Sequence, residues 1–286
     1  MRGFSDDLGP DISTVQPDLR IPELSPGPPQ PGKRVKQTIP GYPAKEVHHT
    51  IYLPVDWTPQ GNFPVLVEYA GNGPYQSNFG DISTGLVEDS KLGFGISQGK
   101  RFIWICLPYL NAAGSKNVTR WWGDSPQYDV SPTVSYCKNA VPWLCKTYGG
   151  DPQRVILCGF SRGAIACNFV GLYDDQIAAL WCGFVVYSHY DGVFTGWRYP
   201  GADRRAALER LNRLQGRPQF VCQETTANSK TSLTATQNYL HSTSISAPFI
   251  FASTGFRNHN DAWVLRPSNA RQQLREWVDT ICKPPK

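Results

Sequence analysis

The sequence predicts a single α/β domain with a mostly parallel sheet and helices on both faces. Short apolar runs of strand length recur along the chain, amphipathic helical patterns separate them, and 40% of the 286 residues are hydrophobic. Strands that are apolar throughout are typical of a parallel sheet that is covered on both faces. A chain of this length and composition can bury one large core.

The first forty residues differ from the rest of the chain. They hold eight prolines and few large apolar side chains, which predicts an extended leader over residues 1–40 and a folded domain over residues 41–286. The leader is expected to lie over the domain or to be detached from it. It has no apolar segment typical of a signal peptide, which fits a cytoplasmic protein or a secreted one written without its signal.

Seven apolar runs of the predicted domain have the length of strands. The first two flank a turn at residues 58–62, which is rich in Pro, Gly and Asn. The predicted strands cover residues 49–54, 63–70, 101–108, 154–159, 183–188, 219–223 and 248–253.

Three other stretches repeat apolar residues at the three- and four-residue spacing of one helix face. The longest begins near Pro132 and is stopped by Gly149 and Gly150. Pro142 lies within it and predicts a kink or an earlier end of the helix. The predicted helical stretches cover residues 134–148, 207–214 and 274–281.

The predicted strand at 154–159 leads into Gly159-Phe160-Ser161-Arg162-Gly163, after which the spacing is that of a helix. With a strand before it and a helix after it, the pattern G-x-S-x-G indicates a nucleophile elbow. This tight turn lifts the Ser161 hydroxyl above the sheet edge and directs the next backbone N–H into the same space. The alternative is an ordinary strand-to-helix turn with a serine cap.

A serine hydroxyl needs a base to remove its proton, so a nucleophilic Ser161 requires a histidine. His259 lies in "STGFRNHNDAW", just after the last predicted strand and before the C-terminal helix. An elbow architecture has its base at this position. His48 and His49 lie at the start of the first predicted strand, far ahead of Ser161 in chain order, and His241 ends a polar helical segment. The alternative for His259 is a solvated loop histidine.

Two carboxylates are candidates for the acid that orients the histidine. Glu224 directly follows the penultimate predicted strand, where this acid is commonest. Asp191 follows the strand before that one, and a carboxylate there also reaches the histidine. Asp261 is only two residues beyond His259 and is expected to point elsewhere. We favour Glu224 over Asp191 and keep both, because either is also compatible with a turn residue or a surface charge.

An oxyanion needs two hydrogen-bond donors. The backbone N–H of Arg162 is one candidate, and the loop "YAGNGPYQ" after the strand at 63–70 supplies the other. Gly71 and Gly73 permit a close approach of the backbone, and the position of Asn72 makes its N–H the second candidate. The alternative is a Gly-rich turn with no electrostatic role.

These motifs resemble the α/β-hydrolase superfamily, in particular its branch of feruloyl and acetylxylan esterases and polyhydroxyalkanoate depolymerases. The resemblance rests on "TIYLPVDWTPQGNFPVLVEYAGNG", "YGGDPQRVILCGFSRGAIA" and "STGFRNHNDAW", and it covers about residues 45–282. It implies Ser161 as the nucleophile, His259 as the base, and the amides of Arg162 and Asn72 as the oxyanion hole. It also favours an extracellular or periplasmic location.

The chain departs from that pattern in two places. The usual His-Gly before the oxyanion loop is Ala70-Gly71 here, and the acid of the family is not obvious in "ETTANSK", where Glu224 comes early. The arginine directly after Ser161 also resembles the G-x-S-R pattern of glucuronoyl esterases, which use that arginine near the reacting carbonyl.

The predicted activity is hydrolysis of carboxylic esters by two acyl-transfer steps, without a cofactor or metal. The expected partner is a small-molecule or polymeric ester, such as a plant-polysaccharide or polyester unit. Trp121 and Trp122 offer flat apolar faces to such a unit, or else pack under a loop. A peptidase or acyltransferase on the same fold, or a non-catalytic binding protein that retains the fold, are the alternatives.

Composition argues against other partners. The net charge of +5 comes without a dense Lys/Arg block interleaved with aromatics, which argues against nucleic acid. The longest apolar runs are far shorter than the roughly 20 residues of a membrane span. None of the eight cysteines has zinc-ligand spacing, and a disulfide that includes Cys282 is left open. The sequence predicts no oligomeric state.

Overall fold

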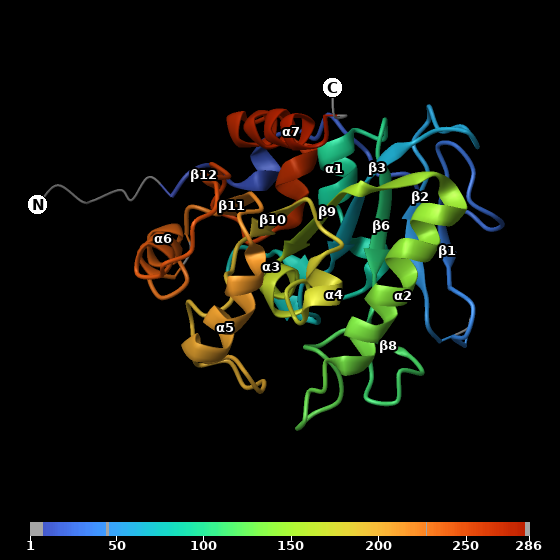
Figure 1. Cartoon of the computed structure of the whole chain (residues 1–286). Helices are drawn as coiled ribbons and strands as arrows, with labels where there is room; N and C mark the ends of the chain where they lie inside the picture. The colour runs from blue at the N-terminus through green and yellow to red at the C-terminus, as the bar shows by residue number, and fades with distance from the viewer. Residues whose placement is uncertain (1–7, 44–45, 227, 284–286) are drawn as a thin grey trace, which may run out of the picture.

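An eight-stranded sheet forms the centre of the computed structural model, which describes residues 8–43, 46–226 and 228–283 (Figure 1). The strand order is β1-β2-β6-β3-β9-β10-β11-β12. The pairs β1–β2 and β2–β6 are antiparallel and every other pair is parallel. In sheet order the strands are β1 (Arg34–Gln37), β2 (His49–Tyr52), β6 (Ile103–Leu107), β3 (Phe63–Tyr69), β9 (Gly150–Phe160), β10 (Gly183–Tyr187), β11 (Gln219–Gln223) and β12 (Phe249–Ser253). The predicted mostly parallel sheet is confirmed.

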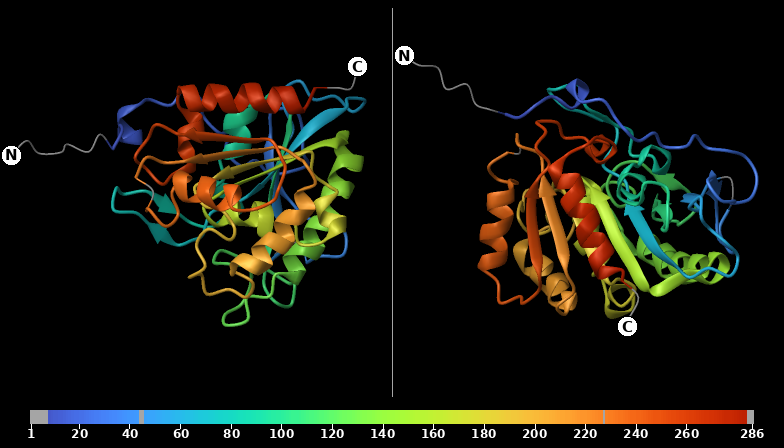
Figure 2. Two further views of the ribbon diagram at one scale, coloured as in Figure 1. Left: turned by 60° about the vertical axis from the view of Figure 1, so that its left-hand side comes forward. Right: turned by 90° about the horizontal axis from the view of Figure 1, so that it is seen from above.

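All seven predicted strands are present, and the edge strand β1 is an addition to them. Its sequence, RVKQ, is short and mostly polar, so it carries little strand signal. It lies within the segment 1–40 that the composition separates from the domain, so the sheet begins inside the Pro-rich segment. Residues 8–33 run along one side of the molecule (Figure 2). Asp18 joins them to the C-terminal helix by an ion pair with Arg271.

Two helical layers cover the sheet (Figure 2). Successive residues of β3 alternate between them, because side chains of a strand point to opposite faces. Leu66 packs with α1 (Leu92–Ser97) and α7 (Asn269–Ile281), whereas Val65 and Val67 pack with the helices of the other face. Those helices are α2 (Ser131–Tyr148), α3 (Arg162–Phe169), α4 (Asp175–Ala178), α5 (Arg204–Leu211) and α6 (Leu233–His241).

Short elements complete the described chain. Two hairpins pair β4 (Tyr75–Gln76) with β5 (Ile82–Ser83) and β7 (Tyr109–Leu110) with β8 (Asn117–Val118). The 3₁₀ turns are η1 (Ile12–Thr14), η2 (Val87–Asp89), η3 (Asn212–Leu214) and η4 (Asp261–Leu265).

Helix α2 shows what ends a helix here. It runs through Pro142 and stops at Gly149, which has the left-handed φ of 69° that a glycine adopts without strain. The predicted end at Gly149 is confirmed, and Pro142 does not end the helix earlier.

Two further findings bear on partners and redox chemistry. Within the described ranges, no helix is both long and apolar enough to cross a membrane. All eight cysteines have free thiols.

Candidate active site

Ser161 lies on the turn between β9 and α3 with φ 56° and ψ −113°. A non-glycine residue rarely adopts this conformation, and it is maintained only when the surroundings enforce it. A Cβ added to Gly159 would lie 2.1 Å from the Gly163 carbonyl oxygen, and one added to Gly163 would lie 1.9 Å from that of Tyr69. Both glycines are therefore required by close packing, and the turn has the geometry of a nucleophile elbow.

Ser161, His259 and Glu224 form a continuous chain of contacts. The Ser161 Oγ lies 3.1 Å from His259 Nε2, and His259 Nδ1 lies 2.8 Å from Glu224 Oε1. The three residues follow β9, β12 and β11, whose carboxyl ends share one edge of the parallel sheet. Both distances allow a proton to move from the serine to the imidazole while the carboxylate holds the opposite N–H.

Asp191, the other candidate acid, does not reach His259. It is buried and accepts two hydrogen bonds from Arg210, at 2.8 and 3.0 Å. Burial raises the pKa of the Asp191 carboxyl, and Arg210 opposes that rise. Asp261 also points elsewhere and pairs with Lys91 at 2.8 Å. Of the two alternatives for the acid, the structure brings only Glu224 to the histidine.

Ser188 also contacts this chain, which the sequence did not suggest. It directly follows β10 with φ 91°, and its Oγ lies 2.8 Å from His259 Nδ1 and 3.1 Å from Glu224 Oε1. The signal that could have found it is position alone, because it ends a strand at the same sheet edge as Ser161 and Glu224.

Burial and the neighbouring histidine act in opposite directions on Glu224. Its side chain is buried, which raises the carboxyl pKa, but the hydrogen bond and charge of His259 outweigh this and hold the pKa below its usual range. An ionised Glu224 can then balance an imidazolium. His189, whose ring centroid is 5.3 Å from that of His259, has its pKa lowered to about 4 by burial and by the His259 charge. His189 is therefore neutral near pH 7.

The backbone N–H groups of Asn72 and Arg162 are among those near Ser161 that have no acceptor in the described part of the chain. Neighbouring polar groups of the Asn72 loop are paired. The Ala70 carbonyl accepts from the Tyr109 hydroxyl at 3.2 Å, and the Asn72 Oδ1 accepts from the Trp121 N–H at 2.9 Å. Asn72 and Arg162 line the same cavity as Ser161.

The cavity around Ser161, which we call the Ser161 cavity, has a volume of about 470 Å³. Trp121 lines it, as the sequence suggested, and Trp197, which the sequence did not suggest, packs against Trp121 at 5.3 Å between ring centroids. The remaining lining is aromatic or uncharged polar at most positions: Tyr75, Ser77, Asn78, Phe79, Ile165, His189, Thr226, Asn228 and Thr231.

Trp122 does not line this cavity, so its proposed role in substrate binding is wrong. It is fully buried, and its ring is stacked on Phe169 with centroids 4.7 Å apart. A large apolar ring gains more from such packing than from exposure. Among the described residues, no group of three or more His, Cys, Asp or Glu side chains is placed to hold a metal ion.

Comparison with known proteins identifies the fold. No family model and no curated protein matches the sequence. Among solved structures, the chain is similar to Thermogutta terrifontis esterase 2 phosphorylated by paraoxon, with TM-score 0.54 and 15% identity over 87% of this chain and 94% of that one. It is similar to an S-formylglutathione hydrolase from Agrobacterium tumefaciens, with TM-score 0.55 and 10% identity over 87% and 93%.

A putative dipeptidyl aminopeptidase IV from Bacteroides ovatus is also similar, with TM-score 0.57 and 14% identity over 87% of this chain. The alignment covers 36% of that longer protein. At these identities the similarity defines the fold alone: the chain has the α/β-hydrolase fold, with a mostly parallel eight-stranded sheet.

Proposed function

We propose that this protein is a serine hydrolase that cleaves carboxylic esters through an acyl-enzyme on Ser161. The observation that carries the proposal is the chain of contacts from Ser161 Oγ through His259 to Glu224, next to two amide N–H groups without acceptors among the described residues. The esterases among the similar solved structures support the same class of reaction.

In the first step, Ser161 Oγ attacks the acyl carbon while His259 Nε2 takes its proton. The carbonyl oxygen becomes an oxyanion that accepts hydrogen bonds from the Asn72 and Arg162 N–H groups. When the intermediate collapses, the carbon–oxygen bond to the alcohol breaks and His259 protonates that alcohol. Water then attacks the acyl-enzyme by the same route, which releases the acid and restores Ser161.

The lining of the Ser161 cavity supports an uncharged ester with a flat acyl or sugar unit. Its charged side chains, Arg162 and Glu224, are buried and already hydrogen-bonded. Trp121 and Trp197 present aromatic rings, and the uncharged polar residues offer hydrogen bonds to hydroxyl groups. This lining fits esters of plant polysaccharides or polyesters, as in the feruloyl-esterase and depolymerase branch that the sequence resembles.

The test compares hydrolysis of p-nitrophenyl butyrate, and labelling by a fluorophosphonate followed by intact mass, in the wild type and in Ser161→Ala. Ser242→Ala, at the end of α6, is the matched control. We expect the wild type and Ser242→Ala to turn over the ester and to gain one probe mass, and Ser161→Ala to do neither. A folded wild type that is inert and unlabelled would instead indicate a binding protein.

The similarity to a dipeptidyl aminopeptidase motivates peptide hydrolysis as the second candidate. An amide leaving group requires the same nucleophile and base. Dipeptidyl p-nitroanilides therefore belong in the same assay, and a higher kcat/KM on them than on the esters would replace the esterase proposal.

A further inference from the structure

The side chain of Arg162 is held by the loop that carries Asn72. It is almost fully buried, and its guanidinium carbon lies 3.8 Å from the centre of the Tyr109 ring. Its Nη1 donates to the Trp121 carbonyl at 2.7 Å and its Nη2 to the Gly71 carbonyl at 2.9 Å. The guanidinium is therefore committed to two loop carbonyls.

The bond to Gly71 has a consequence for the next residue. A trans peptide unit is planar, so the carbonyl of one residue and the N–H of the next point in opposite directions. The Gly71–Asn72 peptide is trans. Because Arg162 holds the Gly71 oxygen on its own side, the Asn72 N–H points away from the guanidinium, and it has no acceptor in the described part of the chain.

The guanidinium charge also acts on this peptide. No carboxylate within salt-bridge distance neutralises Arg162 among the described residues. A charge-assisted hydrogen bond to a carbonyl polarises the amide, so its N–H becomes a stronger donor. Arg162 can thus orient the Asn72 N–H and strengthen it.

The surrounding contacts leave the loop little freedom. Trp121 is held at both backbone groups, since its N–H donates to the Asn72 Oδ1 and its carbonyl accepts from Arg162. The Gly73 N–H donates to the Thr119 carbonyl at 2.9 Å. A Cβ on Gly71 would come within 2.9 Å of the Phe160 ring. The network leaves the Asn72 N–H without an acceptor in the described part of the chain.

We propose that Arg162 is a positioning residue for the oxyanion hole: its backbone N–H is one donor, and its side chain orients the other donor, the Asn72 N–H. This inference rests on the proposed hydrolase function. In this role the Arg162 side chain binds the Gly71 carbonyl of the oxyanion loop and does not touch the substrate. An arginine near the reacting carbonyl would instead contact the substrate. An arginine that only bound the ground-state ester would affect KM, whereas an oxyanion interaction acts in the transition state and affects kcat.

The experiment measures kcat and KM on p-nitrophenyl butyrate for the wild type, Arg162→Lys and Arg162→Met. It adds the inhibition constant of an aryl trifluoromethyl ketone, which forms a tetrahedral oxyanion on serine, and that of the corresponding alcohol, which forms none. Arg275→Met is the matched control, because Arg275 also donates to a glycine carbonyl, that of Gly95, away from Ser161.

We expect Arg162→Met to lower kcat by about 100- to 1000-fold, the loss seen on removing one oxyanion donor, with KM within about threefold. The ketone should weaken by a similar factor and the alcohol should bind unchanged. Arg162→Lys keeps the charge but cannot donate to both the Trp121 and Gly71 carbonyls as the guanidinium does, so we expect an intermediate loss of kcat. This variant serves as the test if Arg162→Met does not fold. Arg275→Met should retain wild-type kcat.

Two results overturn the inference alone while the wild type remains active: unchanged kcat in folded Arg162 variants, whatever their KM, or equal weakening of ketone and alcohol. A wild type that neither hydrolyses the ester nor reacts with a fluorophosphonate overturns the proposed function and this inference with it.

Discussion

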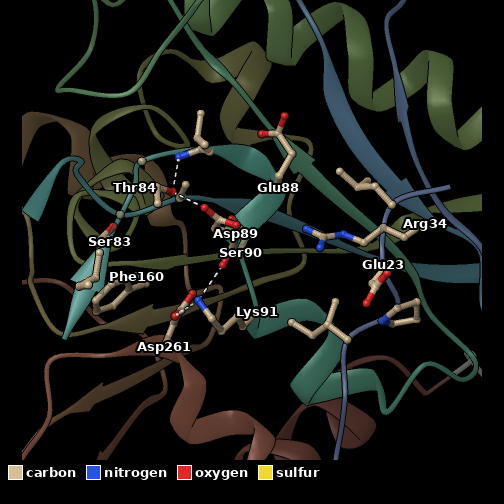
Figure 3. Close-up of a pocket in the computed structure, with 18 residues that line it drawn as sticks. Glu23, Arg34, Ser83, Thr84, Glu88, Asp89, Ser90, Lys91, Phe160 and Asp261 are labelled. Carbon is tan, nitrogen blue, oxygen red and sulfur yellow. Dashed lines mark hydrogen bonds and ion pairs between the residues drawn. The ribbon is translucent and has the colours of Figure 1, made fainter. Parts of the chain in front are cut away.

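Two cavities of similar volume meet at the loop around Gly71 and differ in how their charges are used. The Ser161 cavity is about 470 Å³, and a second cavity, which we call the Arg34 cavity, is about 430 Å³ and is lined by Gly71 and Phe160 (Figure 3). The Arg34 cavity is richer in charged side chains, with Glu23, Arg34, Glu88, Asp89, Lys91 and Asp261 in its lining.

The charges of the Arg34 cavity are largely paired with one another or with the backbone. Lys91 pairs with Asp261 at 2.8 Å, and Glu88 pairs with His48 at 2.9 Å. Arg34 donates to the Val87 carbonyl at 3.2 Å. In the Ser161 cavity, by contrast, the contacts from Glu224 through His259 end on the Ser161 hydroxyl, which lines the cavity. A chain of hydrogen-bonded polar groups that ends on a reactive group therefore indicates an active site, and the number of charged residues alone does not.

The largest expected effect is on activity, and it distinguishes His259, which contacts Ser161, from His48, which contacts Glu88 in the wall of the Arg34 cavity. In His259→Ala, Ser161 has no base, and we expect kcat/KM for the ester to fall on the order of 10⁶-fold. His48→Ala removes one of the two partners of Glu88 instead, and kcat/KM should stay within about twofold. Parallel ester assays on both variants, with circular dichroism to confirm folding, check this. A His259 variant with substantial activity would mean that another group is the base.

The next largest effect distinguishes two buried carboxylates, Glu224 after β11 and Asp191 after β10. We expect the first to be needed for activity and the second for stability. Glu224→Gln loses the negative charge that balances the imidazolium, so we expect kcat to fall by about 10⁴-fold at nearly unchanged thermal stability. Asp191→Asn leaves the Arg210 cation without its carboxylate, so it should lower the unfolding free energy by about 3 kcal/mol while kcat stays within about threefold.

Urea unfolding and ester kinetics on both variants test this contrast. If Asp191→Asn loses activity and Glu224→Gln keeps it, the assignment of the acid is reversed.

The sequence predicted the sheet and the elbow because both depend on local patterns. Apolar runs between helical stretches mark buried strands wherever they occur, and the pattern G-x-S-x-G contains Gly159 and Gly163, the two glycines that the elbow needs. The parallel order also places strand ends at one edge, which is why Glu224 and His259 could be selected by position.

Other features depend on contacts between distant segments. Nothing in the local sequence pairs Asp191 with Arg210 or buries Trp122 against Phe169. Ser188 joins the relay through its positive φ, a conformation that its residue type does not reveal. Strand β1 was missed because four residues that are mostly polar resemble a loop, and its pairing with β2 supplies the missing stabilisation.

The smallest predicted effect is on the free energy of unfolding and concerns Glu88 in the Arg34 cavity. It tests whether the charges of this cavity stabilise the fold. Burial raises the pKa of Glu88, but the hydrogen bonds from His48 and Lys36 outweigh this and lower it to about 2, from the usual 4.5 of a glutamate. A carboxyl with a lowered pKa stabilises the fold above its unfolded-state pKa, and this contribution is lost as pH falls through the folded-state pKa. The window is therefore pH 4.5 to 2.

Glu88→Gln should lower the unfolding free energy by about 2 kcal/mol at pH 7. The loss is no larger because Lys36 is half exposed and solvent screens its charge. The difference from the wild type should shrink between pH 4.5 and 2, as followed by urea unfolding, while kcat/KM at pH 7 stays within about twofold. A difference that does not change with pH would mean that Glu88 acts by packing. A large loss of activity would mean that the two cavities are coupled through Gly71, because that residue joins the wall of one to the oxyanion loop of the other.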